Sequence, residues 1–177
     1  MELSQAIHLI SGFQARTAAP ESWADLGCGA GLFTYALARL LPPGSRIYAV
    51  DKAPVALQAP EHPPPADIRP VRLDFIREPF PFAVLDGVLM ANSLHFVPDQ
   101  PPLLQKIKSA LRPGGRLLLV EYDTDKPNPW VPFPLGFNRL KALLEKQAFA
   151  AVEQLQTAPS RYGRAQLYGV VATWNGE

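Results

Sequence analysis

Residues 25–31 read Asp-Leu-Gly-Cys-Gly-Ala-Gly, the most glycine-rich stretch of the chain. The apolar run that leads into it, at about residues 22–26, predicts a β-strand, and apolar residues at helical spacing follow over about 32–41. The glycines permit a tight turn that a ligand can approach closely, and the first turn of a helix presents free N–H groups. The stretch therefore predicts a strand–turn–helix unit with a ligand-binding turn.

The rest of the chain repeats this alternation of strand and helix. Further strands are predicted at about residues 46–50, 68–73, 85–90, 116–121, 152–156 and 166–173, and helices at about 3–15, 99–111 and 135–148. The run 116–121 is nearly all aliphatic, which is typical of a strand buried on both faces. Alternating elements of this length indicate an α/β fold in which helices cover both faces of a parallel sheet.

Length and composition limit the possible classes of protein. The chain has 177 residues, which we interpret as a single domain over 1–177, with a short N-terminal helix in 1–20, a ligand-binding core in 21–123 and a loop, a helix and two strands in 124–177. Seventeen Lys and Arg balance 16 Asp and Glu, so binding to nucleic acid or to an anionic membrane is not favoured. The single Cys28 excludes a disulfide framework and a cysteine-rich metal site. We expect no metal, no membrane span and a cytoplasmic location.

The position of Asp51 indicates the kind of ligand. Asp51 follows the second predicted strand, where an acidic side chain can accept hydrogen bonds from both hydroxyls of a ribose. A dinucleotide fingerprint that begins at Gly27 would need a small residue at position 32, where Leu32 stands. A Walker motif is also missing after the turn. The pattern favours an adenosine-type ligand over a nicotinamide dinucleotide or a nucleoside triphosphate.

Several further motifs follow in order. They are Asp-Leu-Gly-Cys-Gly-Ala-Gly-Leu-Phe-Thr at 25–34, Val-Asp at 50–51, Arg-Leu-Asp-Phe at 72–75, Pro-Phe-Pro-Phe at 79–82, Leu-Asp-Gly-Val-Leu-Met at 85–90, Ala-Asn-Ser-Leu-His-Phe at 91–96, and the run 111–121 that begins Leu-Arg-Pro-Gly-Gly. From about Trp23 to Asp123 the chain therefore resembles the class I S-adenosylmethionine-dependent methyltransferases, of the small-molecule type 11 kind. The resemblance implies a Rossmann-like, doubly wound, mostly parallel seven-stranded sheet with an antiparallel last strand.

The resemblance also implies a cofactor, S-adenosyl-L-methionine, and the residues that hold it. The expected cofactor-binding residues are Asp25, Gly27, Cys28, Gly29, Asp51, Lys52, Asp74, Phe75, Ala91 and Asn92. The chain departs from the family at Lys52, where many relatives have an apolar residue, and at 54–65, which is too rich in proline for the usual second helix. Cys28 is interpreted as a small packing residue without chemistry of its own.

His95 is the candidate catalytic residue. It follows the fourth predicted strand, at the edge of the sheet where the methyl group should point, and an imidazole with an ordinary pKa near 6.5 suits a general base. The alternative is a structural histidine in a loop. Methyl transfer does not strictly need a base, because holding nucleophile and methyl group in contact already accelerates the displacement.

The loop after the fifth predicted strand is the candidate acceptor site. Little sequence precedes the first strand to enclose an acceptor, so we expect Trp130, Val131 and Phe133 to form an apolar wall. Tyr122 and Asp123, closer to the strand end, are expected to orient a polar group. The alternative is that these aromatic residues pack on the following helix near Phe137.

The sequence thus predicts a methyltransferase that modifies a small, partly apolar acceptor. A cofactor-binding regulatory or scaffolding subunit without turnover is the second hypothesis. A nucleic-acid methyltransferase is disfavoured because Asn-Ser-Leu-His at 92–95 is not the Asn-Pro-Pro-aromatic motif of amino-methylating relatives. The acceptor molecule, the methylated atom and the oligomeric state stay open.

Overall fold

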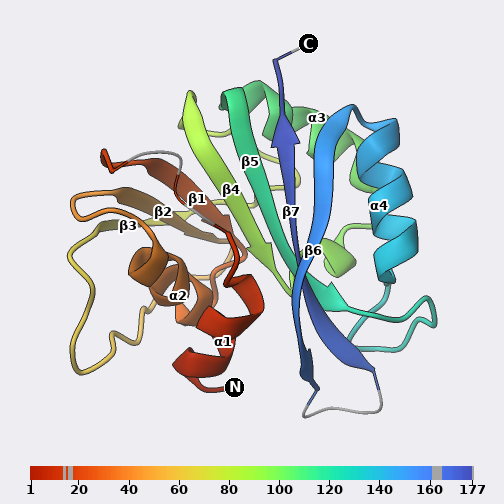
Figure 1. Cartoon of the computed structure of the whole chain (residues 1–177), viewed down its shortest axis with the longest axis horizontal. Coiled ribbons are helices and arrows are strands. Elements are labelled where there is room, and N and C mark those ends of the chain that lie inside the picture. Colours follow the sequence, from red (N-terminus) through yellow and green to blue (C-terminus); the bar gives the residue numbers. More distant parts are fainter. Residues whose placement is uncertain (14, 16–17, 161–164, 177) are drawn as a thin grey trace.

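Seven strands form one sheet in the computed structural model, which describes residues 1–13, 15, 18–160 and 165–176. The strands are β1 (Ser22–Leu26), β2 (Arg46–Asp51), β3 (Asp67–Arg72), β4 (Leu85–Ala91), β5 (Leu111–Tyr122), β6 (Phe149–Pro159) and β7 (Gln166–Trp174). Their order is β3-β2-β1-β4-β5-β7-β6 (Figure 1). The first five pair in parallel, and β7 runs antiparallel to both β5 and β6. The predicted mostly parallel sheet with an antiparallel last strand is confirmed.

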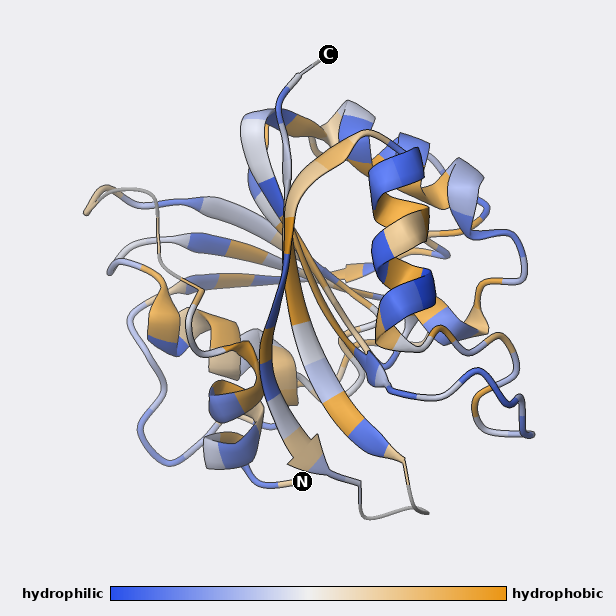
Figure 2. Cartoon of the chain, turned by 45° about the vertical axis from the view of Figure 1, so that its right-hand side comes forward, coloured by the Kyte–Doolittle hydropathy of each residue, from blue (hydrophilic) through white to orange (hydrophobic). Residues whose placement is uncertain are grey.

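The helices cover both faces of this sheet, as expected. They are α1 (Leu3–Ile10), α2 (Leu32–Leu40), α3 (Gln100–Ala110) and α4 (Phe137–Lys146), with a short 3-10 helix η1 (Leu94–Phe96). In β5, Leu117 packs in the core that includes α3 and α4, and the next residue, Leu118, packs in the core that includes α1 and α2. This alternation is the two-residue period of a strand buried on both faces. Figure 2 shows the apolar residues gathered along the central strands.

The structure corrects several boundaries. The N-terminal helix expected over 3–15 ends at Ile10, because Gly12 turns the chain with a φ of 96°. Gln14 and residues 16–17, which fall in the predicted N-terminal segment, lie outside the described residues, as do residues 161–164 and 177 of the predicted C-terminal segment. β5 starts at Leu111 rather than at Arg116, and β6 is longer at both ends than predicted.

The proline-rich segment between β2 and β3 contains no helix over residues 52–66, in agreement with its sequence. Across the described part of the chain, no helix has the length and apolar character needed to cross a membrane. The described residues also contain no group of three or more His, Cys, Asp or Glu side chains that could hold a metal ion.

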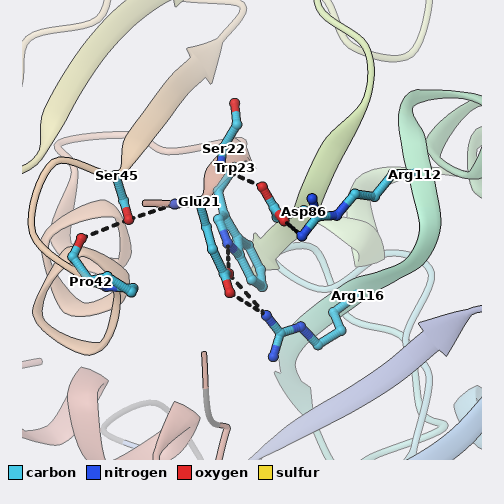
Figure 3. A network of polar contacts seen from close by, with 8 residues as sticks. All are labelled: Glu21, Ser22, Trp23, Pro42, Ser45, Asp86, Arg112 and Arg116. Atoms are coloured by element: carbon cyan, nitrogen blue, oxygen red, sulfur yellow. Dashed lines mark hydrogen bonds and ion pairs between the residues drawn. The ribbon is translucent and has the colours of Figure 1, made fainter. Parts of the chain in front are cut away.

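A buried tryptophan joins the three central strands near their amino ends. Trp23 is fully buried and lies across β4 at Gly87, where an added Cβ would come within 2.3–2.5 Å of three indole carbons. The indole N–H donates to the Glu21 carboxylate at 2.8 Å (Figure 3). Arg116 of β5 donates to both oxygens of the same carboxylate, at 3.0 and 2.9 Å. Because the buried charges are paired, the contact holds β1 and β5 on either side of β4.

A second set of polar contacts in Figure 3 extends this arrangement to neighbouring elements. The Asp86 carboxylate of β4 accepts a hydrogen bond from the Ser22 N–H at 2.8 Å and forms an ion pair with Arg112. The Ser45 hydroxyl accepts the Glu21 N–H at 2.9 Å and donates to the Pro42 carbonyl at 2.7 Å. The amino ends of β1, β2, β4 and β5 are therefore fixed relative to one another.

Substituting Gly87→Ala should strongly destabilise the protein, because the new methyl group would overlap the indole ring of Trp23. Overpacking of this kind costs about 1–3 kcal/mol or more. Chemical denaturation measures the change in the free energy of unfolding. In a Trp23→Leu background the ring is absent, so the same Gly87→Ala change should cost much less. Equal costs in both backgrounds would show that the clash is not the cause.

Candidate active site

The glycine turn lies at the carboxyl end of β1, next to the segment that follows β4. Gly27 has a φ of 87°, and a Cβ at this position would lie 2.6 Å from the Cβ of Ser93. The N–H groups of Gly27 and Cys28 both donate to the Val50 carbonyl, at 2.8 and 2.9 Å. Only glycine fits this close approach, so the turn is held tightly against β2 and against Ser93.

Gly29 and Asp51 come together at the open side of this turn. The Gly29 N–H donates to one oxygen of the Asp51 carboxylate at 3.0 Å, and the other oxygen accepts the Ala53 N–H at 3.0 Å. A Cβ added at Gly29 would meet no atom within 4 Å, so the backbone here faces open space. Lys52 is exposed beside Asp51. A ligand can therefore approach the bare backbone with a carboxylate next to it.

Asp74 and Phe75 follow the end of β3, and the ring of Phe75 approaches the same turn. One Asp74 oxygen accepts the N–H groups of Ile76 and Arg77, at 3.0 and 3.3 Å, which fixes the loop. The ring of Phe75 lies 3.6 Å from the position that a Gly27 Cβ would take. Thus Phe75 forms an aromatic wall beside the turn.

The segment after β4 is tied to both neighbouring strands. The Ser93 hydroxyl donates to the Leu26 carbonyl of β1 at 2.6 Å, and the Asn92 N–H donates to the Val120 carbonyl of β5 at 2.8 Å. Asn92 follows Ala91 and has a φ of 53°, in the left-handed region that Asn tolerates better than most residues. The buried side-chain oxygen of Asn92 has no hydrogen-bond donor within the described residues.

Asp25 lies beneath the turn rather than on its open side. Its side chain is 1% exposed, and one carboxylate oxygen accepts the Thr34 hydroxyl at 2.6 Å. The other oxygen has no donor among the residues that the structure describes. Burial raises the pKa of Asp25 to about 7, and the nearby charge of Asp51 acts in the same direction. The proton occupancy of this carboxyl therefore changes near neutral pH.

Cys28 belongs to the turn, where burial disfavours the thiolate form of its side chain. Burial raises the pKa of this thiol to about 12, and the charges of Asp25 and Asp51 add to the effect. A thiol that stays protonated is a poor nucleophile. The structure therefore places Cys28 in the turn as a packing residue.

His95 and Glu121 form a buried pair at the ends of β4 and β5. The Nδ1 atom of His95 lies 2.5 Å from one oxygen of the Glu121 carboxylate. The other oxygen accepts the N–H groups of Leu94 and His95, at 3.0 and 3.2 Å. Because Glu121 is surrounded by donors, an ionised carboxylate that accepts Nδ1–H suits the site. That tautomer leaves Nε2 with a lone pair that can accept a proton.

A cavity of about 980 Å³ opens beside this pair. It is lined by Asn92, His95, Phe96, Tyr122, Thr124, Lys126, Pro127, Asn128, Trp130, Val131 and Ala165. Most of these residues lie in the loop after β4 or the loop after β5, while Tyr122 ends β5 and Ala165 precedes β7. A hydrogen bond of 3.0 Å from the Phe133 N–H to the His95 carbonyl joins the two loops. The volume lies at the upper end of the range for small-molecule sites.

Three of the five expected acceptor residues, Tyr122, Trp130 and Val131, line this cavity. Trp130 is 78% exposed, so it is not part of the core near Phe137. Phe133 and Asp123 do not line the cavity; the Phe133 backbone ties the loop to His95, and Asp123 accepts the Phe137 N–H. The ring of Tyr122 lies 5.9 Å from the ring of His95.

Sequence reasoning missed Glu121, Phe96, Lys126 and Asn128 as members of the site. The only signal for Glu121 was an acidic residue at the end of an otherwise aliphatic strand, which needs a partner when it is buried. The partner, His95, follows a different strand. For Lys126 and Asn128 the loop sequence gave no indication of which side chains would face a cavity.

The sheet order, the antiparallel β7 and the glycine turn after β1 define the fold of the class I S-adenosylmethionine-dependent methyltransferases. The structure matches the 1,6-didemethyltoxoflavin-N1-methyltransferase of Burkholderia thailandensis with a TM-score of 0.71 and 22% identity, over 98% of this chain and 78% of that one. It matches the N-methyltransferase NodS of Bradyrhizobium japonicum with a TM-score of 0.69 and 18% identity, over 99% and 94%.

The family model of the methyltransferase domain matches residues 24–119, which is more than half of the chain. The chain therefore belongs to the methyltransferase domain family. Acetylserotonin O-methyltransferase of Mus musculus is 40% identical to it over 107 residues, which is 55% of this chain and 27% of that protein. An uncharacterized methyltransferase of Mycobacterium bovis is 35% identical over 101 residues, or 56% and 50%. The chain thus spans half or less of the length of these relatives.

The buried Asp25 should make stability depend on pH. Its pKa is about 7 in the folded protein against 3.8 for the ordinary carboxyl, so the free energy of unfolding should fall as pH rises from about 4 to 7. The Asp25→Asn variant cannot ionise and keeps an oxygen for Thr34. Between pH 5 and pH 8 the free energy of unfolding should therefore fall in the wild type but not in Asp25→Asn. The difference between the two proteins should shift in favour of the variant by on the order of 2 kcal/mol. Urea denaturation at both pH values measures this. A constant difference between the two proteins would contradict the buried, neutral carboxyl.

Proposed function

We propose that this protein is an S-adenosylmethionine-dependent methyltransferase that transfers a methyl group to a small, partly apolar acceptor. The observation that carries the proposal is that one segment, Asn92–His95, both contacts the glycine turn through Ser93 and lines the cavity. A cofactor at the turn and an acceptor in the cavity would therefore meet at this segment. The human N-acetylserotonin methyltransferase, solved in complex with the cofactor, supports the same assignment through its similar fold, with a TM-score of 0.65.

The residues around the turn suit this cofactor. Asp51 offers carboxylate oxygens for ribose hydroxyls, and the open space at Gly29 leaves room for a ligand against the backbone. Asp25 and Asn92 each have a buried oxygen without a donor in the described structure, and the cofactor carries ammonium and hydroxyl donors. Asp74, Phe75 and Lys52 complete the proposed cofactor site, with Gly27, Cys28 and Ala91 contributing backbone.

His95 is the proposed catalytic base and Glu121 is its positioning residue. S-adenosylmethionine supplies, when bound, a methyl group on a sulfonium, which makes that carbon electrophilic. Glu121 holds the imidazole through Nδ1, so that Nε2 can take the proton that a hydroxyl or amine acceptor loses as it is methylated. The backbone N–H groups of Leu94 and His95 hold the Glu121 carboxylate in place, and its contact with Nδ1 orients the ring and favours this tautomer.

The acceptor is proposed to lie against Tyr122 and Trp130, in the cavity that the loop after β5 encloses. Phe133 serves this site indirectly, since its N–H holds the loop to His95. We further propose that 1–177 acts as a single domain in a reducing compartment such as the cytoplasm. The unpaired, buried Cys28 supports that location.

Substituting Asp51→Ala should weaken binding of S-adenosylmethionine and of its demethylated product. Losing charge-assisted hydrogen bonds to ribose costs about 1.5–3 kcal/mol each at most, which corresponds to roughly a 10- to 100-fold higher Kd for one bond. Isothermal titration calorimetry measures both ligands. Asp67→Ala is a matched control, because Asp67 is a surface carboxylate at the start of β3, paired with arginines. An unchanged Kd in Asp51→Ala would remove this residue from the site.

The His95→Gln variant should lose turnover and keep cofactor affinity. The test uses methyl-labelled cofactor with a panel of small phenols, amines, thiols and carboxylates, and general-base catalysis contributes about 10²–10⁴-fold. Glu121→Gln should lower kcat less and shift the pH profile, because the imidazole loses its anionic partner. Wild-type turnover of His95→Gln from about pH 6 to 9 would exclude the base. Cofactor binding without transfer to any acceptor would instead favour the regulatory subunit.

A further inference from the structure

We propose that the acceptor is a planar, largely apolar molecule that carries a carboxylate, and that Lys126 binds this carboxylate. This inference rests on the proposed function, because it assigns the chemical class of the acceptor to the same cavity. Its basis is the charge, the rigidity and the exposed aromatic surface of the cavity wall.

Lys126 is the only Lys, Arg, Asp or Glu among the described residues that line the cavity. No Asp or Glu side chain lines the cavity, and Lys126 has no ion pair within the part of the chain that the structure describes. Its acidic neighbours in the loop are engaged elsewhere. One Asp123 oxygen accepts the Phe137 N–H at 2.9 Å, and one Asp125 oxygen accepts the Gly136 N–H at 2.9 Å, both at the start of α4. An anionic group in the cavity would therefore meet a cation, while the nearby Glu121 carboxylate is buried behind His95 and held by its own donors.

The loop that carries Lys126 is held in place before any ligand binds. The Lys126 N–H donates to the Thr124 hydroxyl at 3.2 Å. The side-chain oxygen of Asn128 accepts the N–H groups of Trp130 and Val131, at 2.9 and 3.0 Å, and this closes a tight turn. Since these bonds use only the oxygen, the Asn128 amide N–H₂ group stays available as a second donor in the cavity. One ammonium and one amide suit a singly charged carboxylate.

Aromatic surface at the same cavity favours a flat apolar body. Phe96 is 53% exposed and Trp130 is 78% exposed, and both line the cavity. With Phe133, which supports the loop, they are three of the five large apolar side chains that are exposed in the described structure. Exposed apolar surface gathered in one place is typical of a binding site. A planar ring would cover these side chains through stacking or edge contacts.

The two ends of this acceptor would then have different roles. Asn92 and His95, at the strand ends, face the atom that receives the methyl group, and Lys126, in the loop, binds the carboxylate. The anionic group is therefore distinct from the methylated atom. Neutral acceptors of the same shape should bind less tightly, but they should still reach His95.

A matched pair of planar ligands tests the inference directly. A hydroxynaphthoic acid and its primary carboxamide have the same shape, and only the acid is charged. Their Kd values are measured by calorimetry on the full chain in the presence of S-adenosylhomocysteine. The wild type should bind the acid about 5- to 10-fold more tightly than the amide. Raising the ionic strength to about 0.5 M should narrow this preference, because salt screens the charge.

Two variants assign the effect to one side chain. Lys126→Gln should bind acid and amide equally, whereas Lys146→Gln, which makes the same charge change on the exposed side of α4, should keep the wild-type preference. A wild type without preference, binding of neither ligand, or a preference that persists in Lys126→Gln would each overturn the inference. Cofactor affinity and methyl transfer to neutral acceptors are measured on the same samples. If both persist, the proposed function stands even when the carboxylate inference fails.

Discussion

Glu121 has a carboxylate that is almost wholly removed from water, and it meets three hydrogen-bond donors from a segment that follows another strand. A buried charge of this kind is costly unless every oxygen is satisfied. The segment after β4 must therefore fold back onto β5, and this one requirement sets the position of His95, the shape of η1 and the mouth of the cavity. The Phe133 N–H then attaches the next loop to the same place, through the His95 carbonyl. The geometry of the candidate site therefore follows from satisfying one carboxylate.

The amino ends of the central strands, opposite the candidate site, are held by a steric constraint rather than by a buried charge. Gly87 leaves the space that the indole of Trp23 fills, and the indole in turn reaches the Glu21–Arg116 pair. This packing at the amino ends fixes the spacing of β1, β4 and β5. Because parallel strands carry their loops at the same carboxyl edge, that spacing also places the glycine turn, the Asn92 segment and Tyr122 side by side. Packing at the amino ends of these strands thus positions the candidate site residues at their carboxyl ends.

Much of this fold could be predicted from the sequence, because the signals are local. The glycine turn and the aliphatic run of β5 each specify one element, and their order specifies the parallel sheet. β6 was predicted too short because it is the last strand of the sheet, where adjacent polar residues and register shifts against β7 interrupt the strand pattern. The site was less accessible to prediction. Asp25 belongs to a recognisable motif, but its hydrogen bond to Thr34 of α2 and the pairing of Glu121 with His95 depend on how elements meet in space.

The two buried oxygens without donors, on Asp25 and Asn92, connect stability with the proposed function. Each costs the folded protein free energy, since a desolvated acceptor has lost its hydrogen bonds to water. A protein selected for stability alone would have apolar side chains at these positions. Both oxygens lie around the glycine turn, where the proposed cofactor would bring donors and positive charge. Binding there would recover part of the cost, and any ligand that binds only the folded state raises stability by mass action. The two unpaired oxygens therefore lie where a ligand can bind them. The tight packing of Gly87 against Trp23 stabilises the fold and helps to offset their cost.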